Sequence, residues 1–115
     1  MHEYSIVASL IDSVEREALA HGGTRVHRLQ VKIGECAGVE LDLLETAFMT
    51  FRERTICAAA RLDIESVAAA WACPSCSQPI EKGAVLRCVG CARPATMIQG
   101  DEIILERIEM EADDV

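Results

Sequence analysis

The chain has 115 residues, 50% of them apolar and only four aromatic, and its 19 acidic and 11 basic side chains give a formal net charge of −8. This length corresponds to one domain, with room for a small subdomain. The negative charge argues against a broad nucleic-acid-binding surface and against an acidic membrane partner, because both require clustered lysine and arginine. We expect a cytoplasmic protein, since no apolar run approaches the ~20 residues of a membrane-spanning helix and the N-terminus lacks the pattern of a secretion signal.

The first half of the chain predicts a helix, a strand and a second helix. Apolar side chains recur at steps of three and four over residues 5–21, as in an amphipathic helix, and the glycine pair at 22–23 marks its end. Residues 28–33 alternate between polar and apolar side chains, which indicates a strand with one buried face. A second helical stripe runs from about residue 40 to residue 53, and it should cover that face of the sheet. The two stripes consist of Val7, Leu10, Ile11, Val14 and Ala18, and of Leu41, Leu44, Phe48 and Phe51.

The second half predicts two more strands on either side of a segment with a different composition. Leu62, Ile64 and Val67 suggest the first of these strands, and residues 102–110, which are rich in isoleucine, predict the second. The segment between them, residues 71–99, contains four of the six cysteines and all three prolines, and its own charge is +2. We therefore expect this segment to be an inserted subdomain. The rest of the chain, residues 1–70 and 100–115, should form the main domain.

The chain ends in an acidic stretch. Residues 109–115 contain four acidic side chains. Such charged ends are usually poorly ordered unless packing holds them in place, so we expect this stretch to fray into solvent.

The strongest sequence signal is a pair of C-x2-C motifs in the inserted segment. The motifs contain Cys73, Cys76, Cys88 and Cys91. Two such turns bring four thiolates to one point, and this closed tetrahedral set suits a structural zinc ion. Pro74 fits the first turn, and Gly90 should allow a positive φ in the second. A bound metal would also explain how so short a segment can fold.

Other readings of the cysteines lead to different functions. Iron accepts the same four thiolates, a thioredoxin-like redox enzyme would need only one C-x2-C pair, and a disulfide framework fits poorly with a reducing compartment. A zinc-ribbon interaction module of a nucleic-acid-associated assembly is the main alternative function. It is disfavoured because the charge of a zinc tetrathiolate cancels the segment's +2 and Trp71 is the segment's one aromatic side chain.

The remaining candidate residues give no sign of catalysis. Cys57 lies in an apolar stretch and should be a buried core residue, while Cys36 lies near two glycines, and neither belongs to a catalytic motif. His21 and His27 are isolated and should be surface residues. The chain has no convincing pair of carboxylates, no nucleophile beside a base and no glycine-rich phosphate loop, so we expect no enzymatic activity.

The N-terminus offers a second candidate metal site. His2 supplies an imidazole, the commonest metal-binding side chain in proteins. If Met1 is retained, its amine, the main-chain nitrogen of His2 and the imidazole can close fused chelate rings around one ion. The main-chain nitrogen of Glu3 could complete a planar set of four nitrogens. Such a set favours Ni(II) or Cu(II) over zinc or magnesium.

Taken together and in this order, the motifs resemble the HypA/HybF family of hydrogenase nickel-incorporation proteins. The resemblance rests on Met1-His2-Glu3, on residues 31–35 (Val-Lys-Ile-Gly-Glu) leading into residues 38–40 (Gly-Val-Glu), on the paired cysteines and on residues 100–102 (Gly-Asp-Glu). It implies an α+β fold with two helices packed on a three-stranded sheet and an inserted four-cysteine zinc subdomain. The chain departs from some relatives in having Tyr4 after the triplet and no histidine beside the cysteine motifs.

The same resemblance implies a nickel metallochaperone rather than an enzyme. Nickel would be held by Met1, His2 and Glu3, through the imidazole of His2 and main-chain nitrogens, and zinc by the four cysteines. The implied partners are a GTPase accessory protein and the large subunit of [NiFe]-hydrogenase and, in some organisms, urease accessory proteins. We expect no nucleic-acid or membrane partner, and the chain to be a monomer or a homodimer.

Overall fold

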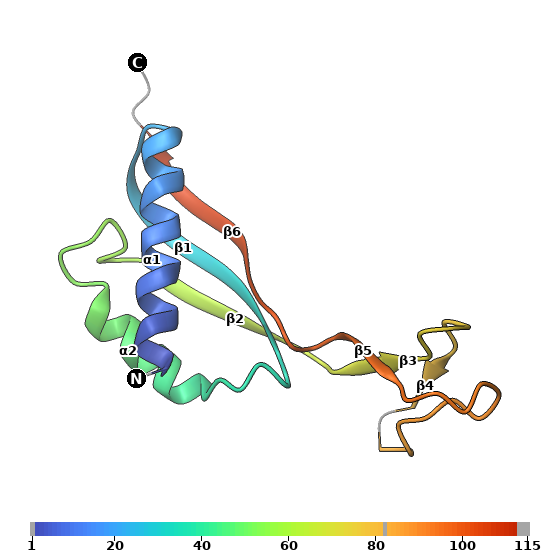
Figure 1. Ribbon diagram of the computed structural model, residues 1–115. Coiled ribbons are helices and arrows are strands. Elements are labelled where there is room, and N and C mark those ends of the chain that lie inside the picture. Colours follow the sequence, from blue (N-terminus) through green and yellow to red (C-terminus); the bar gives the residue numbers. More distant parts are fainter. Residues whose placement is uncertain (1, 82, 113–115) are drawn as a thin grey trace. The chain divides into compact units, whose positions relative to one another are not determined.

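The main part of the fold consists of two helices and a three-stranded sheet, as predicted (Figure 1). The computed structural model describes residues 2–81 and 83–112, with only the main chain of His2. The predicted nickel ligand Met1 and the chain end at 113–115 lie outside the described residues. The strand order is β2-β1-β6. The elements are α1 (His2–Ala20), β1 (Gly23–Gly34), α2 (Leu41–Phe51), β2 (Arg61–Val67) and β6 (Ile103–Ala112).

The core forms where the apolar stripes of the helices meet one face of the sheet. All five predicted side chains of α1 are buried, as are the alternating side chains Leu29, Val31 and Ile33 of β1. The two helices also pack against each other. On α2 the buried side chains are Leu44 and Phe48 together with Ala47. This apolar burial supplies the main stabilisation of the fold.

Three details differ from the sequence-based expectations. Helix α1 begins at His2 and not at residue 5. Leu41 and Phe51, the first and last residues of α2, are 36% and 43% exposed, so only the centre of the predicted stripe is buried. Residues 109–112 do not fray. They continue β6, since pairing within the sheet satisfies their main-chain groups.

The polar face of β1 is held by an ion-pair cluster that joins all three strands. Arg28 of β1 donates hydrogen bonds from Nε to the carboxylate of Asp63 in β2 and, at 3.1 Å, from Nη1 to Oε2 of Glu109 in β6. Hydrogen bonds from Arg61 and Arg28 lower the pKa of Asp63. The cluster fixes the lateral order of strands that are far apart in the sequence.

A second, smaller sheet carries the cysteine motifs. Its strand order is β4-β3-β5, and β3 pairs antiparallel with both neighbours. Trp71, at the centre of β3, lies opposite Ile80 of β4 and Met97 of β5. Sequence patterns did not predict this sheet, since none of its strands is long enough to show a period. The strands are β3 (Ala70–Ala72), β4 (Pro79–Ile80) and β5 (Thr96–Gln99).

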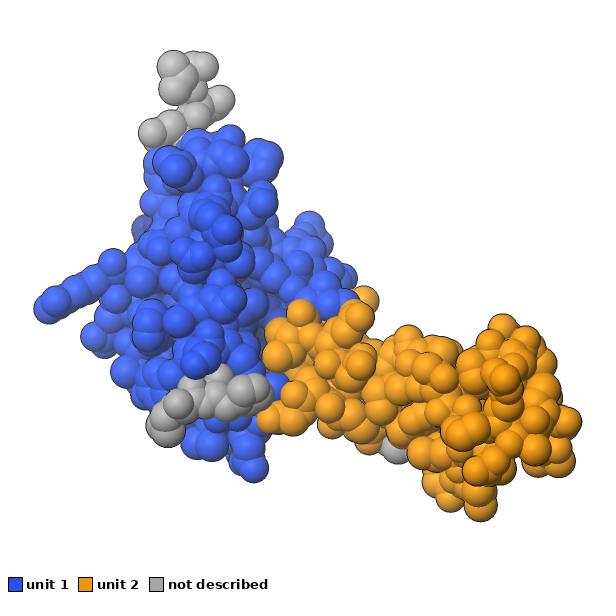
Figure 2. All heavy atoms as spheres, viewed as in Figure 1, with its two compact units in different colours: residues 1–31, 39–65, 104–115 blue, residues 32–38, 66–103 orange. Residues whose placement is uncertain are grey.

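The chain divides into two compact units, coloured separately in Figure 2. Unit 1 contains residues 1–31, 39–65 and 104–115, and unit 2 contains residues 32–38 and 66–103. Unit 2 therefore includes the second sheet, the cysteine motifs and the segments that lead into them.

Within unit 2, three chain segments cross at very close range. A Cβ added to Gly34 would lie 2.1 Å from the carbonyl carbon of Gly100, and one added to Gly100 would lie 2.5 Å from Cα of Ala69. The main-chain N–H of Cys36 donates a hydrogen bond of 2.7 Å to the carbonyl of Gly100. The side-chain carboxylate of Glu35 accepts a hydrogen bond of 2.7 Å from the N–H of Ala69. We call Gly34, Gly100 and Ala69 the glycine crossing. At Gly34 and Gly100 only glycine, which has no Cβ, allows this approach.

Candidate metal centres

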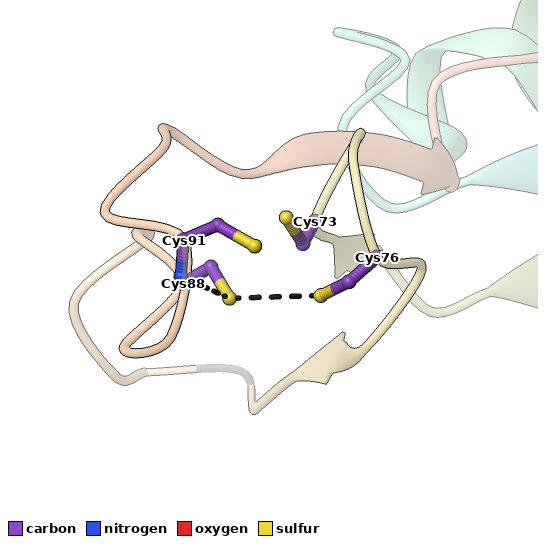
Figure 3. Close-up of side chains that lie close together, drawn as sticks. All are labelled: Cys73, Cys76, Cys88 and Cys91. Carbon is purple, nitrogen blue, oxygen red and sulfur yellow. Dashed lines mark hydrogen bonds between the residues drawn. The ribbon is translucent and has the colours of Figure 1, made fainter.

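The four predicted zinc ligands come together in unit 2 (Figure 3). The sulfur atoms of Cys73, Cys76, Cys88 and Cys91 all lie within 4.8 Å of one another. The Sγ atoms of Cys76 and Cys88 are 3.8 Å apart. A tetrahedral zinc ion with Zn–S bonds of about 2.3 Å has sulfur atoms about 3.8 Å apart, so the cluster has the dimensions of such a site. This cluster could hold a metal ion such as zinc.

Both C-x2-C turns use the same main-chain geometry. The N–H of Ser77 donates to the carbonyl of Cys73 at 2.9 Å, and the N–H of Ala92 donates to the carbonyl of Cys88 at 2.8 Å. Ser77 and Ala92 both have left-handed φ values, 62° and 54°. The expectation of a positive φ at Gly90 is therefore wrong: the reversal of chain direction falls one residue after each second cysteine.

Main-chain N–H groups point at the sulfur atoms and make thiolates more favourable. The N–H of Ser75 lies 3.4 Å from Sγ of Cys73, and the N–H of Cys91 lies 3.4 Å from Sγ of Cys88. Hydrogen bonds from the main chain of Cys76 and Ser75 lower the pKa of Cys73 to about 6. Donors of this kind stabilise negative charge on sulfur.

The last thiol of the cluster resists ionisation in the absence of a cation. Hydrogen bonding with the neighbouring cysteines, Cys76 first and then Cys73 and Cys88, raises the pKa of Cys91 to about 12. Four thiolates so close together repel one another, and a divalent cation removes that penalty. The donor set is all sulfur and closed, which fits a structural zinc ion and leaves no position for a reacting water.

The predicted nickel site lies at the start of α1 in unit 1. The first turn of this helix contains His2 and Glu3. The carboxylate oxygen Oε2 of Glu3 accepts a hydrogen bond of 3.3 Å from the main-chain N–H of Glu40, the residue that precedes α2. The ring of Tyr4 lies 6.5 Å from the ring of Phe51 at the other end of α2. The first turn of α1 is thus attached to both ends of α2, which sequence patterns did not predict.

The remaining cysteines and histidines lie apart from both centres. Cys57 is fully buried in unit 1, as expected, and burial raises its pKa to about 11. Cys36 is exposed. His21 and His27 are half-exposed or more and face Glu17 at 3.4 Å and Glu111 at 3.0 Å. Among the residues that the structure describes, the four cysteines alone form a cluster of metal-binding side chains.

Comparison with known proteins identifies the family. The family model for hydrogenase/urease nickel-incorporation metallochaperones, HypA, matches residues 1–110. The chain belongs to the HypA family. The hydrogenase maturation factor HypA of Shewanella baltica (strain OS185) is 38% identical over 116 residues, which cover 99% of each chain. That of Aquifex aeolicus (strain VF5) is 37% identical over 115 residues and covers 98% of this chain and 100% of the relative.

Solved structures of HypA proteins share the fold. A solution structure of the Ni metallochaperone HypA from Helicobacter pylori matches with a TM-score of 0.76 at 34% identity, over 96% of this chain and 98% of that chain. A solution structure of a HypA protein matches with a TM-score of 0.81 at 35% identity, over 98% of each chain. The resemblance inferred from the motifs is confirmed.

Membership of the HypA family decides between the function classes. The family consists of nickel metallochaperones, not enzymes, and these findings do not support the alternative of a nucleic-acid-associated zinc ribbon. Among the helices in the described part of the chain, none is both long and apolar enough to cross a membrane.

Proposed function

We propose that this chain binds Ni(II) at Met1, His2 and Glu3 and delivers it during the maturation of [NiFe]-hydrogenase. The ligands are the imidazole of His2 and main-chain nitrogens of the triplet. Four nitrogens in a plane favour Ni(II) over zinc. A urease accessory pathway is a second recipient, because the family model covers nickel incorporation into both enzymes.

The observation that carries this proposal is that α1 begins at His2. The first four N–H groups of a helix have no acceptor within the helix. The main-chain nitrogens of His2 and Glu3 can therefore lose their protons to a metal without breaking a helical hydrogen bond. Since each ligand must be deprotonated, nickel binding should strengthen as pH rises.

For the second centre we propose structural zinc bound by Cys73, Cys76, Cys88 and Cys91. A zinc ion there would join two turns that have few apolar contacts of their own. In functional terms residues 1–70 and 100–115 form the nickel domain and residues 71–99 the zinc subdomain. A cytoplasmic location is part of the proposal, and it is supported by the reduced thiolates that the zinc site requires. Its partners are a GTPase accessory protein and the hydrogenase large subunit.

Nickel titration of the untagged protein tests the proposal. We expect His2→Ala to abolish stoichiometric nickel binding, followed by ultraviolet-visible spectroscopy, while zinc content and circular dichroism stay unchanged. A tag fused before Met1 should have the same effect, because it removes the free amine. The matched controls are His21→Ala and His27→Ala, which remove the other two imidazoles. Undiminished nickel binding in His2→Ala would refute the assignment.

A further inference from the structure

Helical geometry at the start of α1 suits chelation by consecutive main-chain nitrogens. In a helix, where ψ is about −42°, the nitrogens of successive residues lie close to the same side of the chain, whereas in a strand, where ψ is about +135°, they point apart. A chelate ring that includes two successive nitrogens requires the first arrangement. The main chain of His2 and Glu3 is helical, so their nitrogens already have the relative orientation that a bound nickel ion needs.

The first turn of a helix does not keep this geometry by itself. Helix ends fray, because their terminal groups lack hydrogen bonds within the helix. A ligand that binds only the ordered form has an apparent Kd that rises as the ordered fraction of the chains falls. The affinity for nickel therefore depends on the contacts that keep the first turn of α1 helical.

Two contacts with α2 hold this turn, at the place where α1 begins beside α2 (Figure 1). The first is the hydrogen bond of 3.3 Å from the main-chain N–H of Glu40 to Oε2 of Glu3. The second is the pair of rings of Tyr4 and Phe51, whose centroids are 6.5 Å apart and whose planes are tilted by 57°. This geometry lies within the range of favourable aromatic pairs. Glu3 and Tyr4 are both half-buried, so the two residues directly after His2 are fixed to α2.

The end of α2 that carries Phe51 is itself held in place. The next residue, Arg52, donates a hydrogen bond of 2.6 Å to the carbonyl of Ala60, and its guanidinium lies 5.9 Å from the centre of the buried Phe48 ring. The main-chain N–H of Arg52 also donates to the carbonyl of Phe48 at 3.0 Å. Phe51 is 43% exposed, and its ring provides a fixed surface for Tyr4.

We propose that Tyr4 and Phe51 are positioning residues of the nickel site. Neither side chain is a ligand. The ring pair acts through the main chain of His2 and Glu3, which it keeps in the helical form that chelation requires, and the hydrogen bond to the Glu3 carboxylate acts in the same direction. This inference rests on the proposed binding of nickel at the N-terminus. It adds that a residue at the far end of α2 sets part of the nickel affinity.

Nickel titration of untagged variants tests this role. Tyr4→Ala and Phe51→Ala should each weaken nickel binding by about three- to tenfold, because each removes the ring pair. The double variant should bind about as well as either single variant, since both substitutions remove the same contact. Tyr4→Phe keeps the ring and should bind like the wild type. At saturating nickel all these proteins should have the same visible absorption spectrum, because the ligands are unchanged.

A matched control and two separate outcomes make the test decisive. Met49→Ala removes another exposed apolar side chain of α2 and should bind nickel like the wild type, while circular dichroism and zinc content verify that each variant is folded. If His2→Ala abolishes binding but Tyr4→Ala and Phe51→Ala bind normally, or if their losses add in the double variant, this inference alone is overturned. If the wild-type protein binds no nickel, or His2→Ala binds it undiminished, the proposed function fails and this inference fails with it.

Discussion

The main-chain N–H of Glu40 donates a hydrogen bond to the side-chain carboxylate of Glu3, across 37 positions of sequence. Glu40 is the residue before α2, and it has no side-chain cap of its own. The carboxylate of α1 therefore takes the place that a glutamate of the same helix occupies in a capping box. The helix that starts at His2 is held to the start of α2 by this contact.

Replacement of Glu3 should loosen this attachment. We expect Glu3→Ala to lower the free energy of unfolding by about 0.5–1.5 kcal/mol, the usual net contribution of one hydrogen bond, because this bond is long and exposed to solvent. Urea denaturation followed by circular dichroism measures the change. Glu3→Gln keeps an acceptor oxygen and should lose less. Equal losses in the two variants would show that the hydrogen bond is not the cause.

The buried thiol of Cys57 should make stability depend on alkaline pH. Burial, with a smaller contribution from the charge of Glu15, raises the pKa of Cys57 to about 11, from an ordinary value of 9.0. Because the folded state favours the neutral thiol, this contribution is complete below pH 9. It is lost as pH rises from about 9 to about 11. Cys57→Ala should remove this slope in the pH profile of urea denaturation.

The two cysteines outside the zinc cluster, Cys36 and Cys57, should react differently with an alkylating reagent. Cys36 is exposed and should be alkylated by iodoacetamide in the native protein, whereas Cys57 should be alkylated only in denaturant. Peptide mapping by mass spectrometry distinguishes the sites. Rapid labelling of Cys57 under native conditions would contradict its burial.

Zinc removal should unfold the zinc-bearing sheet and spare the helices. The chain has one tryptophan and one tyrosine, Trp71 in β3 and Tyr4 in α1, so each unit carries its own fluorophore. On chelation we expect Trp71 emission to shift to the red while helical circular dichroism persists. Nickel binding should instead quench the fluorescence of Tyr4, which lies two residues after His2. Loss of the helical signal on chelation would contradict the independence of the units.

Replacing the left-handed residue after each C-x2-C motif by glycine should strengthen zinc binding. Ser77 and Ala92 adopt φ values that disfavour any side chain. Relief of this strain outweighs the greater conformational freedom of glycine in the unfolded chain. Each substitution should therefore stabilise the folded turn by a net value of about 0.5 kcal/mol. Competition with a chromophoric chelator should therefore show tighter zinc binding in Ser77→Gly and Ala92→Gly. Weaker binding in both would argue against strain at these positions.

The two glycines of the glycine crossing, Gly34 and Gly100, should tolerate no side chain. Gly34→Ala would push a methyl group into the main chain of Gly100, and we expect a loss of about 1–3 kcal/mol or more in urea denaturation. Gly90→Ala is the matched control, because a Cβ there meets no atom within 4 Å. A neutral Gly34→Ala would mean that the two segments can move apart at little cost.

Local patterns in the sequence determined the helices, the long strands and the cysteine cluster. The stripes of α1 and β1 predict their own burial, because a period of 3.6 or two residues selects one face. The two C-x2-C motifs are short enough that their spacing alone brings each pair of sulfurs together. The proposed nickel ligands, Met1, His2 and Glu3, likewise are consecutive residues. For these features each residue acts with near neighbours in the chain.

Tertiary structure alone decided the features that join distant residues. The Glu3–Glu40 hydrogen bond, the Arg28 cluster and the glycine crossing each depend on segments that meet only after the chain has folded. The strand at 109–112 became ordered because β1 offered it hydrogen-bond partners, whereas its acidic composition alone indicated fraying. The spacing of residue types predicts which face of its own helix or strand a residue occupies. Contacts between elements depend on the path of the whole chain.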